Sequence, residues 1–146
     1  MQDFIASLLG AIVGASAAIG AAWIAYRGAL TTESRKAERA AISDLMSTAF
    51  EWDAALLALQ EGVQRQFVND NLIALDEDVR TTGRNLERLS YLVADQETRT
   101  LARTLARTGW GARVSIKPPS SMADFGAIRT ARDELAARAN KVIAGL

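Results

Sequence analysis

The sequence predicts an all-α protein in which one N-terminal transmembrane helix is followed by a small antiparallel helical bundle. Two observations support this fold class: residues 4–26 form an uncharged run, and apolar residues recur every three or four positions between residues 42 and 93. A spacing of three and four is typical of helices with one buried face. We therefore divide the chain into a short external N-terminus at 1–3, a transmembrane helix at 4–26 and a helical bundle at 27–146.

The run at 4–26 contains no charged residue and no proline. At 1.5 Å per residue its helix would extend roughly 34 Å, slightly more than the ~30 Å hydrocarbon core of a bilayer. Trp23 and Tyr26 close the run and Arg27 follows directly, an order typical of an interfacial anchor. The run is rich in Ala and Gly, so a buried helix of a soluble core is the alternative. Its length and lack of charge favour the span.

Basic residues are distributed unequally around this run. Only Asp3 precedes it among charged side chains, whereas Arg27, Arg35, Lys36 and Arg39 follow it. The positive-inside rule then predicts an inner-membrane protein with its N-terminus outside and its C-terminal domain in the cytoplasm. Membrane lipid is thus one expected partner.

Small residues recur within the run at intervals of four. Without a hydrophobic drive in lipid, membrane helices associate where small side chains let their backbones approach closely. This stripe predicts a helix-packing face and a homo-oligomer, although Ala and Gly are also simply common in this chain. The positions are Gly10, Gly14, Ala18 and Ala22, with Ser16 and Gly20 in a second register.

The bundle is expected to contain helices at about 31–66, 70–94, 95–108 and 121–145. The first two carry heptad-type seams and a short connection, which favours an antiparallel hairpin. The seam positions are Ile42, Leu45, Ala49, Trp52, Leu56, Leu59 and Val63, then Leu72, Leu75, Val79, Thr82, Leu86, Leu89 and Val93. A last helix would bury Phe125, Ile128, Ala131, Leu135, Ala139 and Val142.

Several boundaries follow from capping and breaking residues. Gly28 could loosen the junction after the span, and the threonines at 31 and 32 could cap a new helix or lie on a continuing one. Asp95 is expected to begin the third helix and Gly109-Trp110-Gly111 to end it. Ser121 and Asp124 resemble a capping box. Thr82-Gly83 marks either a soft spot or a close helix crossing.

Arginines recur every fourth residue in the third helix, followed by a tryptophan between two glycines. The basic segment could rest on anionic lipid headgroups, bind an acidic partner or phosphate-bearing ligand, or be an ordinary solvated face. The tryptophan could anchor in an interface or a partner's pocket, or close the bundle core. The candidate contact residues are Arg99, Arg103, Arg107, Trp110 and Arg113.

Acidic residues are concentrated elsewhere. Segment 40–64 has four acids and no base, so we expect it to face the basic third helix, within one subunit or between neighbours. Glu51 and Asp53, two positions apart, diverge on a helix, and Asp76-Glu77-Asp78 diverges likewise. We interpret both groups as surface charges. In the last helix we expect Glu134 to pair with Arg138 on the solvated side.

Composition restricts the function. The chain has no Cys and no His, which removes the commonest nucleophiles, bases and metal ligands, so we expect no enzyme, metal or cofactor. Seventeen basic residues balance seventeen acidic ones, which gives no case for nucleic-acid binding. We expect an oligomeric scaffold, accessory or regulatory subunit that binds another membrane or cytoplasmic protein.

A second function remains open. A span rich in small residues also suits a small pore-forming or lysis-type protein of bacterial or phage origin, as in phage lysis or self-killing systems. The layout of one span before a helical rod resembles the inner-membrane partner of phage spanins. That resemblance would require the bundle outside, contrary to the charge bias.

Overall fold

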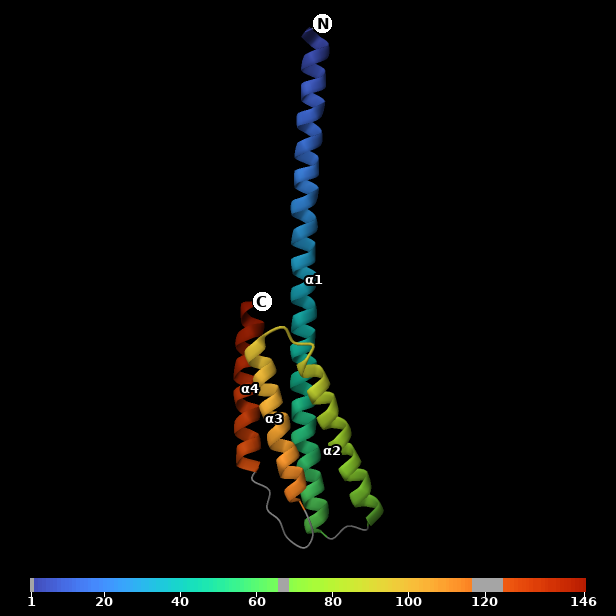
Figure 1. Ribbon diagram of the computed structural model, residues 1–146, viewed down its shortest axis with the longest axis vertical. Helices are drawn as coiled ribbons and strands as arrows, with labels where there is room; N and C mark the ends of the chain where they lie inside the picture. Colours follow the sequence, from blue (N-terminus) through green and yellow to red (C-terminus); the bar gives the residue numbers. More distant parts are fainter. Residues whose placement is uncertain (1, 66–68, 117–124) are drawn as a thin grey trace. The chain divides into compact units, whose positions relative to one another are not determined.

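The computed structural model is all-helical over the residues that it describes, 2–65, 69–116 and 125–146, as the sequence predicts. Its elements are α1 (Gln2–Gln64), α2 (Asn69–Ser90), α3 (Gln96–Ser115) and α4 (Phe125–Gly145). Side chains at 1–21, 69 and 70 are outside the described set. Within residues 38–146 successive helices run in opposite directions (Figure 1), so the expected helical bundle is present.

The chain divides into two units, Met1–Ala37 and Glu38–Leu146, and α1 contributes to both. In the first unit the hydroxyls of Thr31 and Thr32 donate to the carbonyl oxygen of Gly28, at 2.8 and 2.9 Å. Such bonds, three and four residues back, are typical of hydroxyls on a continuous helix. The threonines therefore lie on a continuing helix, and Gly28 does not end it.

Most side chains of the predicted transmembrane segment, those at 4–21, lie outside the described residues. Within the part of the chain whose side chains are described, no helix is long and apolar enough to cross a membrane. The packing positions Gly10, Gly14, Ser16, Ala18 and Gly20 lie outside it. At the end of the run, Ala22, Trp23, Tyr26 and Arg27 are exposed, and the Arg27 guanidinium lies 3.9 Å from the centre of the Trp23 ring.

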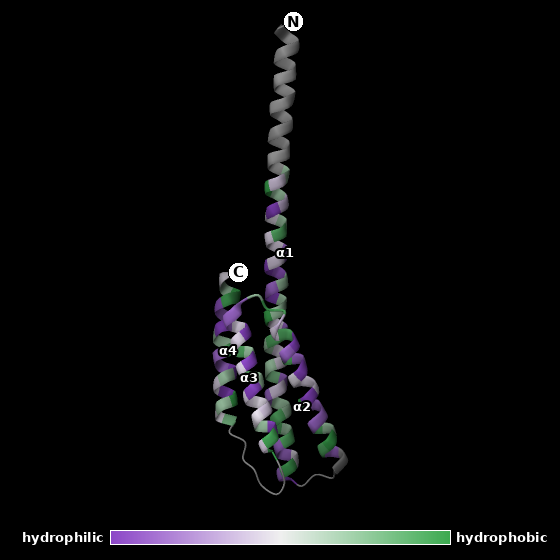
Figure 2. Ribbon diagram, in the orientation of Figure 1, coloured by the Kyte–Doolittle hydropathy of each residue, from purple (hydrophilic) through white to green (hydrophobic). Residues whose placement is uncertain are grey.

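The second unit is built on the predicted seams. From Ile42 to Leu59 every seam position of α1 is buried, and the α2 seam is buried at Val79 and Leu86. In α4 the buried residues are Ile128, Ala131, Leu135 and Ala139. Hydrophilic and hydrophobic residues alternate along α2 and α4 (Figure 2). Burying a large apolar side chain contributes about 1.5–3 kcal/mol, so these positions supply most of the packing energy.

The centre of the bundle is Trp52, which is fully buried. A Cβ built on Gly83 would lie 3.0 Å from its ring, and one built on Gly109 would lie 2.5 Å from it. The indole N–H donates to the Val79 carbonyl oxygen at 3.0 Å, and the Trp110 ring meets Trp52 edge-on with centroids 5.7 Å apart. Thr82-Gly83 is therefore a close crossing. We call Trp52, Gly83, Gly109 and Trp110 the tryptophan centre.

Two helix ends differ from expectation. Gly109-Trp110-Gly111 does not end the third helix, because α3 continues to Ser115 and the Ile116 N–H caps it by donating to Ala112 and Arg113. Gly109 makes room for Trp52 instead of ending a helix. Conversely, α2 ends at Ser90 instead of residue 94, because the N–H groups of Tyr91 and Leu92 donate three residues back in a tight turn.

The remaining boundaries concern α3 and α4. Asp95 begins the third helix as predicted, and its side chain accepts a bond from the Thr98 N–H. The last helix begins at Phe125. The capping box expected at Ser121 and Asp124 lies outside the described residues.

Candidate functional site

The structure divides the predicted basic segment into two groups. Arg99 and Arg113 are half-buried and hold helices together. Nη2 of Arg99 donates to the Val93 carbonyl oxygen at 2.7 Å, just after α2. Nε and Nη2 of Arg113 donate to the two carboxylate oxygens of Asp76 on α2, at 2.7 and 2.8 Å. The Arg113 guanidinium lowers the pKa of the Asp76 carboxyl, against the opposing effect of burial. These two arginines are structural.

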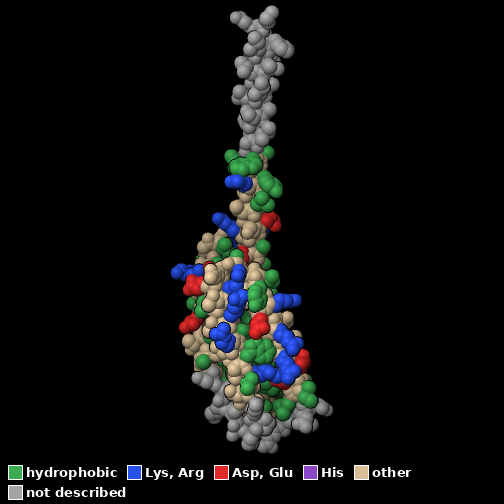
Figure 3. Space-filling view, viewed as in Figure 1, with side chains coloured by type: hydrophobic (Ala, Val, Ile, Leu, Met, Phe, Trp, Pro, Cys, Tyr) green, Lys and Arg blue, Asp and Glu red, His purple; other side chains and the backbone are tan. Residues whose placement is uncertain are grey.

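The other group lines a groove between α2 and α3. Arg103 and Arg107 are exposed there, and the Arg103 guanidinium lies 4.5 Å from the centre of the Tyr91 ring. The groove has a volume of about 380 Å³ and is lined by Glu87, Ser90, Tyr91, Arg103, Ala106, Arg107 and Trp110. Basic side chains gather over α2 and α3 on this face (Figure 3). We call it the basic groove.

Trp110 connects this groove to the core. One edge of its ring meets Trp52, and its indole N–H donates to the Glu87 carboxylate at 2.7 Å. This arrangement favours the interpretation in which Trp110 packs into the bundle. It also engages Glu87, which is the carboxylate of the basic groove.

A second groove, between α1 and α2, has the opposite charge. It has a volume of about 430 Å³ and is lined by Glu51, Ala54, Ala55, Ala58, Asp78 and Thr82. These residues include two carboxylates and no base, and both carboxylates are exposed. We call it the acidic groove. The sequence predicts only separate surface charges here, because neighbouring acids diverge on a single helix, and it does not show that Glu51 and Asp78 line one groove.

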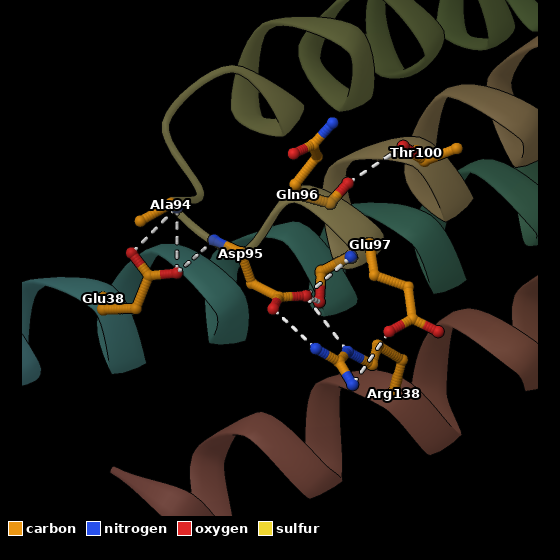
Figure 4. Close-up of polar contacts among 8 residues, drawn as sticks. Glu38, Ala94, Asp95, Gln96, Glu97, Thr100 and Arg138 are labelled. Carbon is orange, nitrogen blue, oxygen red and sulfur yellow. Dashed lines mark hydrogen bonds and ion pairs between the residues drawn. The ribbon is translucent and has the colours of Figure 1, made fainter.

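Polar side chains from three helices meet at the turn between α2 and α3 (Figure 4). Glu38 of α1 accepts bonds from the backbone N–H groups of Ala94 and Asp95, at 2.9 and 3.3 Å. Asp95 in turn accepts from Arg138 of α4, at 2.6 and 3.1 Å. Arg138 also pairs with Glu97 at 2.9 Å. We call Glu38, Asp95, Glu97 and Arg138 the turn cluster.

Contacts within the turn cluster shift the pKa values of its two central groups, Asp95 and Arg138. The Arg138 guanidinium, helped by Thr98, holds the pKa of the Asp95 carboxyl far below its usual range, although burial opposes this. Asp95 likewise raises the pKa of Arg138. The expected pairing of Arg138 with Glu134 is therefore wrong. Arg138 reaches across to α3, where Asp95 offers both oxygens to its planar guanidinium.

Asp53 also differs from the prediction. It is buried instead of exposed, and it pairs with Nη1 of Arg132 on α4. Among the described ion pairs, the one between α1 and another helix joins Asp53 to α4. The acids and bases of α3 pair with α2 and with α4 instead. The acidic part of α1 and the basic part of α3 do not pair within one subunit over these residues.

These arrangements limit the chemistry of the described residues. No group of three or more Asp or Glu side chains among them could hold a metal ion. Four carboxylates among these residues are buried or half-buried. Arginines hold Asp53, Asp76 and Asp95, and backbone N–H groups of the turn donate to Glu38. The accessible surface of these residues includes a pair of oppositely charged grooves, an arrangement suited to binding another protein surface.

Comparison with protein-family models, with curated proteins and with solved structures gives no match.

Proposed function

We propose that this chain is a non-enzymatic, single-pass protein of the inner membrane that acts as an oligomeric scaffold, accessory or regulatory subunit of a membrane complex. Residues 4–26 span the bilayer, the N-terminus lies outside and residues 27–146 lie in the cytoplasm. The observation that carries the proposal is that a single helix, α1, includes both the uncharged run at 4–26 and the first apolar seam of the bundle.

The anchor residues support the membrane part of this proposal. Trp23, Tyr26 and Arg27 are exposed at the end of the uncharged run. Amphipathic rings and a cation are favoured in the headgroup layer of a membrane. A helix in water would gain nothing from exposing them. The small residues from Gly10 to Ala22 then supply the contact between spans.

The bundle supports the non-enzymatic part. Arginines hold its buried Asp53 and its half-buried Asp76, and two accessible grooves on either side of α2 carry opposite charge. Arginines on one groove and carboxylates on the other provide electrostatic complementarity to a protein partner.

The first test combines sidedness with membrane association. A reporter fused to the C-terminus should report the cytoplasm, and the chain should stay in the membrane fraction until detergent is added. Recovery of the intact chain in the aqueous fraction without detergent would overturn the proposal. A reporter signal from outside would favour the spanin-like arrangement instead.

The second test addresses oligomerisation through the span. Gly10→Leu with Gly14→Leu should reduce the cross-linked oligomer, because the larger side chains separate the two backbones. Ala11→Leu with Ala15→Leu adds comparable bulk on the neighbouring side of the helix and should reduce it less. Equal oligomer in both double variants would remove the packing face from the proposal.

The third test addresses the lysis-type alternative. Induced expression of a scaffold should leave growth and membrane potential unchanged, since no ionisable residue lies within the span to line a conducting path. Prompt loss of membrane potential on induction would replace the scaffold with a lesion-forming protein.

A further inference from the structure

We propose that neighbouring copies of this chain bind one another head to tail, with the arginines of one copy's basic groove entering the acidic groove of the next copy. This inference rests on the proposed function, because the spans must first bring the copies side by side. It names the partner of both grooves as a second copy of the same chain.

The basic groove presents two donors. Arg103 and Arg107 are exposed and lie one helical turn apart on α3, and no described ion pair contains either of them. The Tyr91 ring supports the Arg103 guanidinium, which keeps it extended at little cost in side-chain entropy. Glu87, the acid in this groove, already accepts from Trp110. Since no described ion pair joins Glu87 to either arginine, both guanidinium groups can donate to carboxylates from outside.

The acidic groove presents the matching acceptors. Glu51 lines it from α1 and Asp78 lines it from α2, and three alanines of α1 complete most of its lining. The short alanine side chains in the lining leave room for a long arginine side chain. Glu51 accepts a bond of 3.2 Å from the Ser47 hydroxyl, which leaves its other lone pairs available.

A second copy carries the surface that complements either groove. The chain has equal numbers of basic and acidic residues, yet the described grooves separate the two signs on either side of α2. One copy therefore cannot join its own grooves, whereas two copies can. Such a contact is heterologous, because different patches meet. Copies that share one orientation in a bilayer are related by rotation about its normal, so repeated contacts can close into a ring.

Tethering is necessary for this contact. Exposed ion pairs contribute little binding free energy, so the grooves alone would bind weakly. Spans that hold the bundles together raise their effective concentration and make a weak contact effective. The grooves then determine the register and the order of the copies more than the total affinity.

The test uses cross-linking in the full chain, in membranes. Because the natural chain has no cysteine, single cysteines report single contacts. We would co-express two differently tagged copies, one with Thr104→Cys beside the arginines and one with Ala58→Cys in the acidic groove. Oxidation should join the two tags. The matched control replaces Ala58→Cys with Ala137→Cys, at an exposed position on α4. This control pair should give no cross-link.

Charge reversal then tests the chemistry. Arg103→Glu with Arg107→Glu, made in both tagged copies, should reduce the cross-link about tenfold, because repulsion replaces attraction. Glu51→Arg with Asp78→Arg, made in both copies, should do the same. Co-expressing one doubly acidic copy with one doubly basic copy should restore the cross-link. Restoration is not expected if either pair of substitutions simply unfolds the bundle.

The outcomes separate this inference from the proposed function. A second cysteine pair, Gly14→Cys in both copies, reports contact between spans. Spans that cross-link while the groove pair does not would overturn the head-to-tail contact and leave the membrane scaffold standing. Failure of both pairs would overturn the oligomer itself. A groove cross-link that ignores charge reversal, or that captures a different protein, would also overturn the inference.

Discussion

The tryptophan centre and the turn cluster hold the same bundle together with different physical interactions. At the tryptophan centre, one large apolar ring fills the space between two glycines and makes one hydrogen bond. At the turn cluster, Glu38 and Asp95 accept bonds from backbone N–H groups, and Arg138 clamps two acids. The first contact joins α1, α2 and α3, and the second joins α1, α3 and α4.

This difference predicts which kind of substitution destabilises each site. Close packing fails when volume is added or removed, because neighbouring atoms cannot relax fully. A partly exposed polar cluster tolerates changes in volume but responds to charge, to capping and to pH. The tryptophan centre should therefore respond to size and the turn cluster to ionisation, and three substitutions can test this contrast.

The largest effect is expected for Trp52→Ala. It removes a fully buried ring, and the neighbouring Gly83 and Gly109 have no side chains that could fill the cavity. It also leaves the Val79 carbonyl oxygen without its indole donor. We expect a loss of about 3–5 kcal/mol in the free energy of unfolding. Chemical denaturation of the full chain in detergent, followed by circular dichroism, measures it.

Trp23→Ala provides the matched control, because Trp23 belongs to the first unit and is 55% exposed. It should leave the unfolding transition of the bundle unchanged. Equal losses in the two variants would mean that Trp52 is not the centre of the packing.

A smaller effect is expected for Gly109→Ala. The new Cβ would lie 2.5 to 3.0 Å from three atoms of the Trp52 ring, so the ring or the helix must move. We expect a net loss of about 2 kcal/mol, even though alanine favours a helix over glycine by about 1 kcal/mol. Gly111→Ala is the control in the same helix, since nothing lies within 4 Å of its added Cβ.

The sign of the change distinguishes the two glycines. Gly111→Ala should raise the stability by about 0.5–1 kcal/mol through helix propensity alone. If Gly109→Ala also raised it, the close contact with Trp52 would be excluded.

The helices and their buried faces could be predicted from the sequence because they depend on local periodicity. Residues three and four apart lie on the same side of a helix wherever that helix packs. The seam from Ile42 to Leu59 is buried for this reason, as is the last-helix stripe from Ile128 to Ala139. The role of Asp95 as the N-cap of α3 could be predicted for a similar reason, because capping is a local interaction.

The partners across helices could not be predicted in this way. Arg132 pairs with Asp53 and Arg138 with Asp95, across separations of 79 and 43 residues. No local pattern specifies such pairs, and the local pairing of Glu134 with Arg138 competed with the real one. Gly109 was misinterpreted for the same reason. A glycine that ends a helix and one that makes room for a neighbouring ring look alike until the neighbour is known.

The smallest effect is expected at the turn cluster, where Asp95→Ala removes the cap of α3 and the partner of Arg138. Loss of an N-cap lowers the free energy of unfolding by about 1–2 kcal/mol. Asp95→Asn keeps an acceptor for the Thr98 N–H and removes only the negative charge, so it should cost less than Asp95→Ala at neutral pH. Equal losses would mean that the capping hydrogen bond contributes nothing and that the charge accounts for the whole effect.

The pH dependence provides the sharper measurement. Because Arg138 lowers the pKa of Asp95 in the folded state, the unfolded chain takes up this proton first as the pH falls below the ordinary value of 3.8. The stabilisation is therefore complete above that pH and is lost progressively below it. The difference in stability between the natural chain and Asp95→Asn should narrow in acid, since the substitution has already removed the charge. The corresponding difference for Gly109→Ala should not depend on pH, because packing involves no proton. If both differences narrowed together, volume and charge would not be acting separately at the two sites.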